Sequence, residues 1–312
     1  MALVTVDDFK RINSPNAAFD AERSRHYCEQ LEQGKILFFD RAPFDLPAEH
    51  RRFLLSAKQE NTRLHKNISY RPEKNLLRGF PSSDMENFNR LREIMRDYSK
   101  QVVGFFDKFL VPYSEKRLLD FASFRPIEER GRKLSLHKRN ELLHVDAFPS
   151  RPTRGGRILR VFTNINPAES RIWEIGEDFR SLAEKYAFDA GLEKIQKQSA
   201  SPAGRVFRQT SKILNKAGLP VPARSAYDRF MLRFHDYLKE NTTYQTESEK
   251  TRLEFPPDST WLVYTDGVPH SVLAGQFALE QTFIIPFDAL VAPQNSPAKV
   301  LEKMCRASLI TN

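Results

Sequence analysis

Residues Arg157–Asn166 constrain the possible folds more than any other stretch, because the strand that they predict has two very different faces. Side chains alternate between the two faces of a β-strand. One face is mostly apolar and suits packing against helices: Leu159, Val161, Thr163 and Ile165. The other is polar or aromatic and suits a functional interior: Arg160, Phe162, Asn164 and Asn166. This stretch predicts a sheet with helices on one side and a site on the other.

The order of patterns along the chain predicts an α+β fold. Helical patterns dominate residues 1–120, most clearly over Asp84–Tyr113, where Ser83 or Asp84 serves as the N-cap. β patterns dominate residues 121–176 and 251–290. Residues 177–250 form a basic helical insertion, and 291–312 hold a last helix, roughly Pro297–Ile310. The 312 residues suffice for one large domain or two small ones. We expect a single catalytic domain with a double-stranded β-helix (jelly-roll, cupin-like) core and helices packed outside it.

Three residues form a candidate metal site. His144 and Asp146 are two apart in Glu141–Phe148, so on a β-strand both point to the same face. His270 follows a second strand-like run, Thr260–Tyr264. A facial ferrous site uses two histidines and one carboxylate and leaves three positions open. The spacing is common by chance, so on this evidence alone all three could be ordinary polar strand and loop residues.

Longer motifs around these residues carry a family resemblance. They are Leu143-His-Val-Asp-Ala-Phe-Pro-Ser-Arg-Pro152, Gly156-Arg-Ile-Leu-Arg-Val-Phe-Thr-Asn-Ile-Asn-Pro167, Thr265-Asp-Gly-Val-Pro-His-Ser-Val-Leu273 and Ala278-Leu-Glu-Gln-Thr-Phe283. They resemble iron(II)- and 2-oxoglutarate-dependent dioxygenases, most closely the bacterial Kdo hydroxylases, which act on the Kdo sugar of Kdo-lipid A. The resemblance implies that His144, Asp146 and His270 bind Fe(II). It also implies that 2-oxoglutarate and O2 are consumed, Kdo is hydroxylated at C3 to give Ko, and succinate and CO2 are released.

One departure from the wider superfamily concerns 2-oxoglutarate. Many of these enzymes hold its far carboxylate with an Arg or Lys about ten residues past the second histidine. Here Ser271–Phe283 contains no cation, and Gln281 stands near the expected place. A charge-assisted partner is still needed, ideally a bidentate guanidinium. We expect Arg160 first, beside Asn164 on the polar face, although a surface position for it stays open. Arg125 is the second choice, ahead of Arg157 and Arg171.

The charge balance predicts a polyanionic partner. The net charge is +9, and residues 192–239 hold ten Lys or Arg against three acids. Four cations fall on one stripe of a predicted amphipathic helix: Arg205, Arg208, Lys212 and Lys216. This stripe could lie on an anionic membrane surface or be a solvated helix face. Lys138 and Arg139, ahead of the metal motif, could meet phosphate or carboxylate groups of the substrate or form a charged hairpin tip.

Location and partners follow from what the sequence lacks. No apolar run is long enough to span a bilayer, and acids stand near the N-terminus where a signal peptide needs positive charge. Two cysteines do not make a disulfide framework. We expect a cytoplasmic protein, peripheral on the inner face of the inner membrane, with Kdo-lipid A as its substrate and no nucleic-acid partner; its oligomeric state is not predicted. The alternatives are a same-fold oxygenase acting on protein or nucleic acid, or a basic binding module with a decayed metal site.

Overall fold

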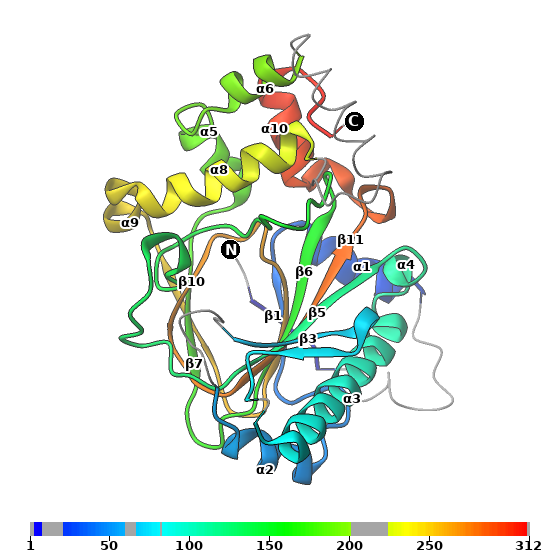
Figure 1. Ribbon diagram of the computed structural model, residues 1–312. Helices are drawn as coiled ribbons and strands as arrows, with labels where there is room; N and C mark the ends of the chain where they lie inside the picture. The colour runs from blue at the N-terminus through cyan, green and yellow to red at the C-terminus, as the bar shows by residue number, and fades with distance from the viewer. Residues whose placement is uncertain (1–2, 8–20, 60–66, 82, 201–223, 311–312) are drawn as a thin grey trace, which may run out of the picture.

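The computed structural model describes residues 3–7, 21–59, 67–81, 83–200 and 224–310 (Figure 1). Two β-sheets face each other. The larger has the strand order β1-β2-β9-β6-β11-β5-β3-β4, and the smaller has the order β10-β7-β8. The strands are β1 Leu3–Thr5, β2 Ile36–Phe39, β3 Ile68–Arg71, β4 Leu76–Arg78, β5 Leu118–Arg125, β6 Arg157–Asn164, β7 Arg171–Ile175, β8 Thr251–Phe255, β9 Thr260–Tyr264, β10 His270–Ala274 and β11 Ala278–Ile285.

The helices lie outside this sandwich (Figure 1). They are α1 Ala21–Glu32, α2 Ala48–Ser56, α3 Met85–Phe109, α4 Val111–Ser114, α5 Phe179–Tyr186, α6 Leu192–Ala200, α8 Ala226–Glu240, α9 Thr242–Glu247 and α10 Pro297–Cys305. Single 3-10 turns are η2 Pro72–Lys74, η3 Leu136–Lys138, η4 Phe287–Ala289 and η5 Pro293–Asn295. None of the helices among the described residues is both long and apolar enough to cross a membrane.

Strand β6 has the two faces that its sequence predicts. Leu159 and Val161 are fully buried in the core that α3 covers, where Phe106 stacks on Phe283 with ring centroids 4.2 Å apart. On the opposite face, Phe162 packs between the sheets, and its ring centroid is 5.1 Å from that of Trp173. The helix-covered face and the interior of the sandwich are therefore separated by the pleat of one strand.

Helix α3 starts where the sequence indicates and ends earlier. Asp84 is its N-cap and accepts a hydrogen bond from the backbone N–H of Asn87 at 3.1 Å. The helix was expected to continue to Tyr113 but ends at Phe109. Pro112 cannot donate to the helical ladder, and the backbone N–H of Val111 donates instead to Ser24 Oγ at 2.9 Å. A separate short turn, α4, follows.

The first 120 residues supply more than helices. Besides β2, they contribute β1 at one edge of the large sheet and the hairpin β3–β4 at the other. These strands have three or four residues each. Alternation over so few positions cannot be told from chance, which is why the sequence did not show them.

Helices α5, α6, α8 and α9 make up the described part of the insertion and pack with α10 at one end of the sandwich (Figure 1). Helix α10 ends at Cys305 and not near Ile310, because Arg306 adopts a left-handed conformation with φ of 49°. The Glu302 carboxylate then accepts the backbone N–H of Leu309 at 2.8 Å. Residues 201–223, with the predicted stripe Arg205, Arg208, Lys212 and Lys216, lie outside the described residues.

Candidate metal centre

The two histidines of the candidate site are joined through their backbones. His144 N–H donates to the His270 carbonyl at 3.1 Å, and His270 N–H donates to the His144 carbonyl at 2.9 Å. The expected strand around His144 is wrong, because this pair is an isolated bridge. A continuing strand pair would next use the backbone N–H of Val268. That N–H instead donates to the Tyr264 carbonyl at 2.9 Å and closes a turn. Asp146 N–H donates to the Thr265 carbonyl, at 2.8 Å.

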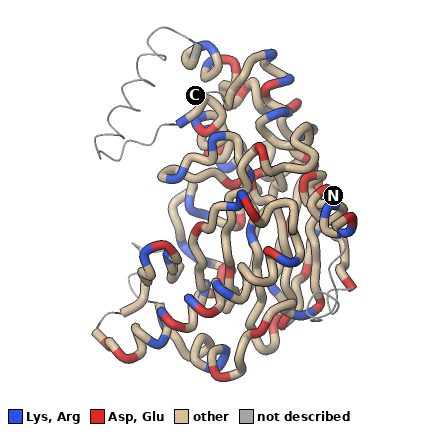
Figure 2. Tube along the Cα trace, turned by 90° about the vertical axis from the view of Figure 1, so that its right-hand side faces the viewer, with Lys and Arg blue, Asp and Glu red and all other residues tan. Residues whose placement is uncertain are grey.

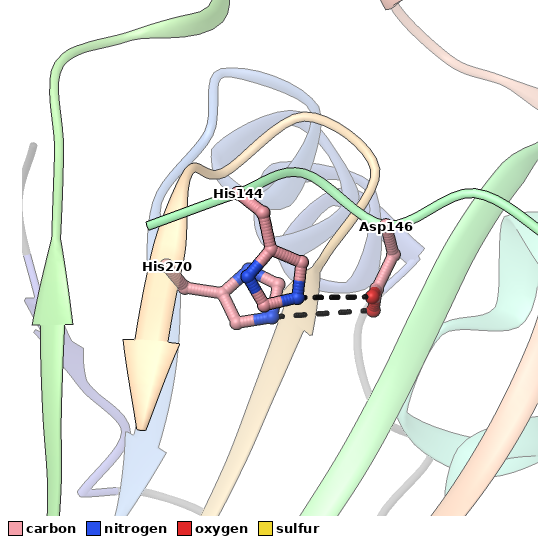
Figure 3. Close-up of side chains that lie close together, drawn as sticks. All are labelled: His144, Asp146 and His270. Atoms are coloured by element: carbon pink, nitrogen blue, oxygen red, sulfur yellow. Dashed lines mark ion pairs between the residues drawn. The ribbon is translucent and has the colours of Figure 1, made fainter. Parts of the chain in front are cut away.

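The three side chains converge on one point (Figure 3). Asp146 Oδ1 lies 3.7 Å from His144 Nε2, and its Oδ2 lies 4.0 Å from His270 Nε2. Each imidazole has its Nδ1 beside a backbone carbonyl, at 2.7 Å from Leu142 for His144 and at 2.8 Å from Val268 for His270. Protonation of Nδ1 in these hydrogen bonds leaves the Nε2 lone pairs free to bind a cation.

Electrostatics set the protonation states that a divalent metal requires. Burial lowers the pKa of His144 well below its ordinary value and also lowers the pKa of His270. Burial alone would raise the pKa of Asp146, but the nearby Arg160 charge and the hydrogen bond with His144 lower it well below its usual range. Two neutral imidazoles and an ionised carboxylate are therefore available. This donor set fits a ferrous ion with open coordination positions.

The three candidate metal ligands line a cavity of about 190 Å³ whose walls are strongly cationic. Arg125, Arg160 and Arg171 reach it from β5, β6 and β7, and Lys239 reaches it from α8. Among the described residues that line the cavity, Asp146 is the only acid. Such a cavity favours anionic ligands.

The three arginines differ in how far their donors are already used. Arg160 Nη2 lies 3.0 Å from Asp146 Oδ2, and its Nη1 donates to Glu280 Oε1 at 2.8 Å. Arg125 donates to the other oxygen of Glu280, from Nε at 3.1 Å and from Nη2. Arg171 is 1% exposed and donates to the Gly275 carbonyl. Its Nε and Nη2 have no hydrogen-bond partner among the described residues, although Nη2 lies 3.5 Å from Glu129 Oε1 in an ion pair.

The register of the small sheet places Arg171 away from the metal. On β7, Ile175 pairs with His270, whereas Ile172 pairs with Ala274 at the far end of β10. Arg171 is the residue before Ile172, so it also lies at the end of β7 that is far from His270. Its side chain points to the same side of the strand as that of Ile175. Burial lowers the pKa of its guanidinium to about 10, which leaves the group charged at neutral pH. A ligand that spans the cavity could bind the metal with one end and Arg171 with the other.

The comparisons with known proteins identify the family. Residues 15–308 match the family model of 3-deoxy-D-manno-oct-2-ulosonic acid (Kdo) hydroxylase. The chain belongs to the Kdo hydroxylase family. No curated protein matches it.

Solved structures of Kdo hydroxylase KdoO, described as a non-heme Fe(II) alphaketoglutarate-dependent dioxygenase, agree with this assignment. One is a complex with alphaketoglutarate and Fe(III), one is an apo structure and one holds cobalt(II). Each is 35% identical to this chain with a TM-score of 0.81 and covers 99% of it, and 97–98% of the solved chain is matched. The expected jelly-roll fold, the family and the enzyme class are confirmed.

Two residues expected near 2-oxoglutarate lie elsewhere in this Kdo hydroxylase. Asn164 Nδ2 donates to the carbonyls of Glu169 and Phe255, both at 2.9 Å, so it holds a turn. Gln281 accepts a hydrogen bond from Ser99 Oγ of α3 at 2.7 Å, on the helix-covered face of the sheet. Neither lines the cavity. Alternation places Asn164 on the inner face of β6, but it cannot show that the strand ends there.

The two basic residues ahead of the metal motif lie outside the cavity, and their contact with substrate stays a prediction. Lys138 and Arg139 do not line the cavity, and Arg139 Nε donates to Glu141 at 2.6 Å. Two residues that the sequence analysis did not select, His235 and Lys239 of α8, do line it. They are four apart, so they share a helix face. That spacing is visible in the sequence, but the position of α8 over the metal is not.

Proposed function

We propose that this Kdo hydroxylase uses Fe(II), 2-oxoglutarate and O2 to hydroxylate the Kdo sugar of Kdo-lipid A at C3, giving Ko, succinate and CO2. The observation that carries the proposal is the convergence of His144, Asp146 and His270 at one side of a cationic cavity. Family membership supports the sugar as substrate. The KdoO structures in complex with alphaketoglutarate and Fe(III), with cobalt(II), and with succinate and Fe(III) support the metal and the co-substrate.

The protein would hold the metal through three groups and leave its other positions for ligands. Iron bound there supplies redox chemistry with O2 at the expense of 2-oxoglutarate. The Trp173 ring stacks on His270 with centroids 5.1 Å apart, which restricts rotation of that imidazole. Arg160 offsets the charge of Asp146 and orients its carboxylate.

Arg125, Arg160 and Arg171 form an arginine wall of the cavity, and this wall would receive the far carboxylate of 2-oxoglutarate. Arg171 supports this role best, because its buried guanidinium lies away from the metal and its Nε and Nη2 donate no hydrogen bond among the described residues, although Nη2 is ion-paired with Glu129 at 3.5 Å. The sequence-based choices, Arg160 and Arg125, stay predictions, and both are engaged with Glu280. A buried guanidinium with free donors gains most from a bidentate carboxylate.

We also propose that the enzyme works at the cytoplasmic face of the inner membrane as a peripheral protein, since a lipid-linked sugar stays near the bilayer surface. Basic and acidic residues are interspersed along the described chain (Figure 2), so the concentrated positive charge of residues 192–239 is the better candidate for contact with anionic lipid. The predicted stripe within it lies outside the described residues.

Acceptor-dependent turnover tests the proposed function. The purified protein with Fe(II), ascorbate and 2-oxoglutarate should form succinate when detergent-solubilised Kdo-lipid A is added, and the sugar should gain one oxygen by mass spectrometry. Succinate that instead depends on an added protein or nucleic acid would favour the same-fold alternative. No succinate with any acceptor, despite bound metal, would favour a binding module.

A further inference from the structure

Lys239 is a buried cation without a carboxylate partner. Its side chain is on α8, which crosses the end of the sandwich near β10 (Figure 1), and the residue is 3% exposed. The ammonium donates to the carbonyls of His137 at 3.0 Å and Arg139 at 2.8 Å. Among the described residues, no carboxylate lies within 4.0 Å of it. A buried ammonium is costly unless it is paired, so an anionic ligand would stabilise this arrangement.

Lys239 forms part of the wall of the metal cavity. Lys239 lines the cavity together with His144 and His270, and His235 of the same helix lies edge-on to His144 with ring centroids 5.2 Å apart. Two of its three N–H groups are used by the carbonyls, and the third has no acceptor in the described chain. The metal cavity therefore has a free donor on its helical side.

The cavity has two cationic regions for two anionic ligands. The arginine wall comes from β5, β6 and β7 inside the sandwich, whereas Lys239 comes from the insertion. The co-substrate 2-oxoglutarate needs cations for its far carboxylate, and the wall supplies three. The other reactant is an ulosonic acid, so it also carries a carboxylate.

We infer that the Lys239 ammonium binds the carboxylate of the sugar acid and thereby directs C3 towards the metal. The inference rests on the proposed function. In a 3-deoxy-2-ulosonic acid the carboxylate carbon and C3 are both bonded to C2. A cation that holds the carboxylate beside the metal therefore fixes the neighbouring C3 within a few bond lengths of the metal. The insertion thus contributes to substrate selection as well as to the outer packing.

Two substitutions of Lys239 test the inference, because one removes its charge and the other keeps it. Lys239→Gln keeps an amide that can bond one carbonyl of the 137–139 turn, and Lys239→Arg keeps the charge. We expect Lys239→Gln to lower kcat/KM for Kdo-lipid A roughly ten- to a hundredfold, the range for a lost hydrogen bond to a charged group. The KM for 2-oxoglutarate should change by less than about twofold. The affinity for Co(II) should not fall, because the substitution removes a positive charge that acts on His144 and Asp146. Lys239→Arg should recover most of the activity. Lys185→Met removes a surface lysine of the same insertion, paired with Glu177, and should have no effect.

A modified substrate separates carboxylate recognition from a structural role. Kdo-lipid A with its sugar carboxyl converted to the methyl ester should be a poorer substrate of the wild type by a similar factor. Lys239→Gln should no longer distinguish the acid from the ester, whereas Lys239→Arg should. Undiminished discrimination in Lys239→Gln, or its loss in Lys239→Arg, overturns the inference while the proposed function stands. Wild-type protein that forms no succinate with Kdo-lipid A overturns the proposed function itself.

Discussion

His144 and His270 are 126 positions apart in the sequence, yet each donates its backbone N–H to the carbonyl of the other, at 3.1 and 2.9 Å. This single bridge positions two imidazoles whose Nδ1 atoms are each fixed by a carbonyl two residues earlier. The ligand geometry therefore rests on backbone hydrogen bonds, so side-chain substitutions at these positions should remove the site without removing the bridge.

Loss of metal binding is the first expected result. His144→Ala, Asp146→Ala and His270→Ala should each abolish product formation and weaken Co(II) binding, because a three-ligand site loses a third of its donors. Titration with Co(II) and succinate release measure the two effects. His26→Ala, at an exposed position on α1, is the control and should behave as the wild type. Normal turnover by purified His144→Ala would show that the ligands are wrongly assigned.

Long patterned segments were predictable from the sequence and short ones were not. The alternation of β6 and the spacing in α3 correctly indicated which faces are buried. Strands β1, β3 and β4 are too short for periodicity to appear. The order of elements and the family motifs were enough to predict the jelly-roll class.

The candidate site was predictable in its ligands and only partly in its surroundings. The sequence grouped His144, Asp146 and His270, and the structure brings them together. It could not show that Lys239 and His235 reach the cavity, since this depends on how α8 packs over the metal segment. The side chain of Gln245 exchanges hydrogen bonds with both backbone groups of Leu143 and so ties the insertion to that segment. Such pairings are tertiary and have no local signal.

The 2-oxoglutarate site gives the second prediction. Arg171→Met should raise the KM for 2-oxoglutarate strongly, since truncating one partner of a buried charge pair costs about 2–5 kcal/mol. Arg160→Met should instead weaken metal affinity, because its guanidinium contacts Asp146. Steady-state kinetics with varied 2-oxoglutarate and a Co(II) titration separate the two effects. If Arg160→Met raises the KM for 2-oxoglutarate and Arg171→Met does not, then the sequence-based choice is the correct anchor.

Glu280 gives the third prediction, on stability against pH. Burial would raise its pKa, but the charges of Arg160 and Arg125 lower it from 4.5 to about 2. The folded state therefore favours the ionised form, and the resulting stability is present above pH 4.5 and lost as the pH falls towards 2. The shift corresponds to about 3 kcal/mol of unfolding free energy.

Urea unfolding of the wild type and Glu280→Gln between pH 7 and pH 3 measures this contribution. The wild type should be more stable at pH 7, because the variant removes the carboxylate that pairs with two buried guanidinium groups. The difference between the two proteins should be constant above pH 5 and shrink below 4.5. A difference that stays unchanged down to pH 3 would contradict the assigned shift.

The last prediction concerns the membrane. An acceptor whose acyl chains stay in the bilayer requires the enzyme to work near the headgroup plane, and reversible electrostatic attachment is expected from the basic insertion. Each cation near an anionic leaflet contributes about 1 kcal/mol. Replacing all four stripe residues with Gln should therefore weaken vesicle binding by several kcal/mol. These residues are Arg205, Arg208, Lys212 and Lys216. Sedimentation with anionic vesicles measures this loss, and wild-type binding should fall as salt rises. A control replaces four exposed lysines in the N-terminal part of the chain with Gln: Lys58, Lys74, Lys100 and Lys108. The control should sediment as the wild type, and both variants should keep their activity on detergent-solubilised acceptor. Equal losses in the two variants would mean that net charge alone drives binding, and an unchanged stripe variant would place the contact surface elsewhere.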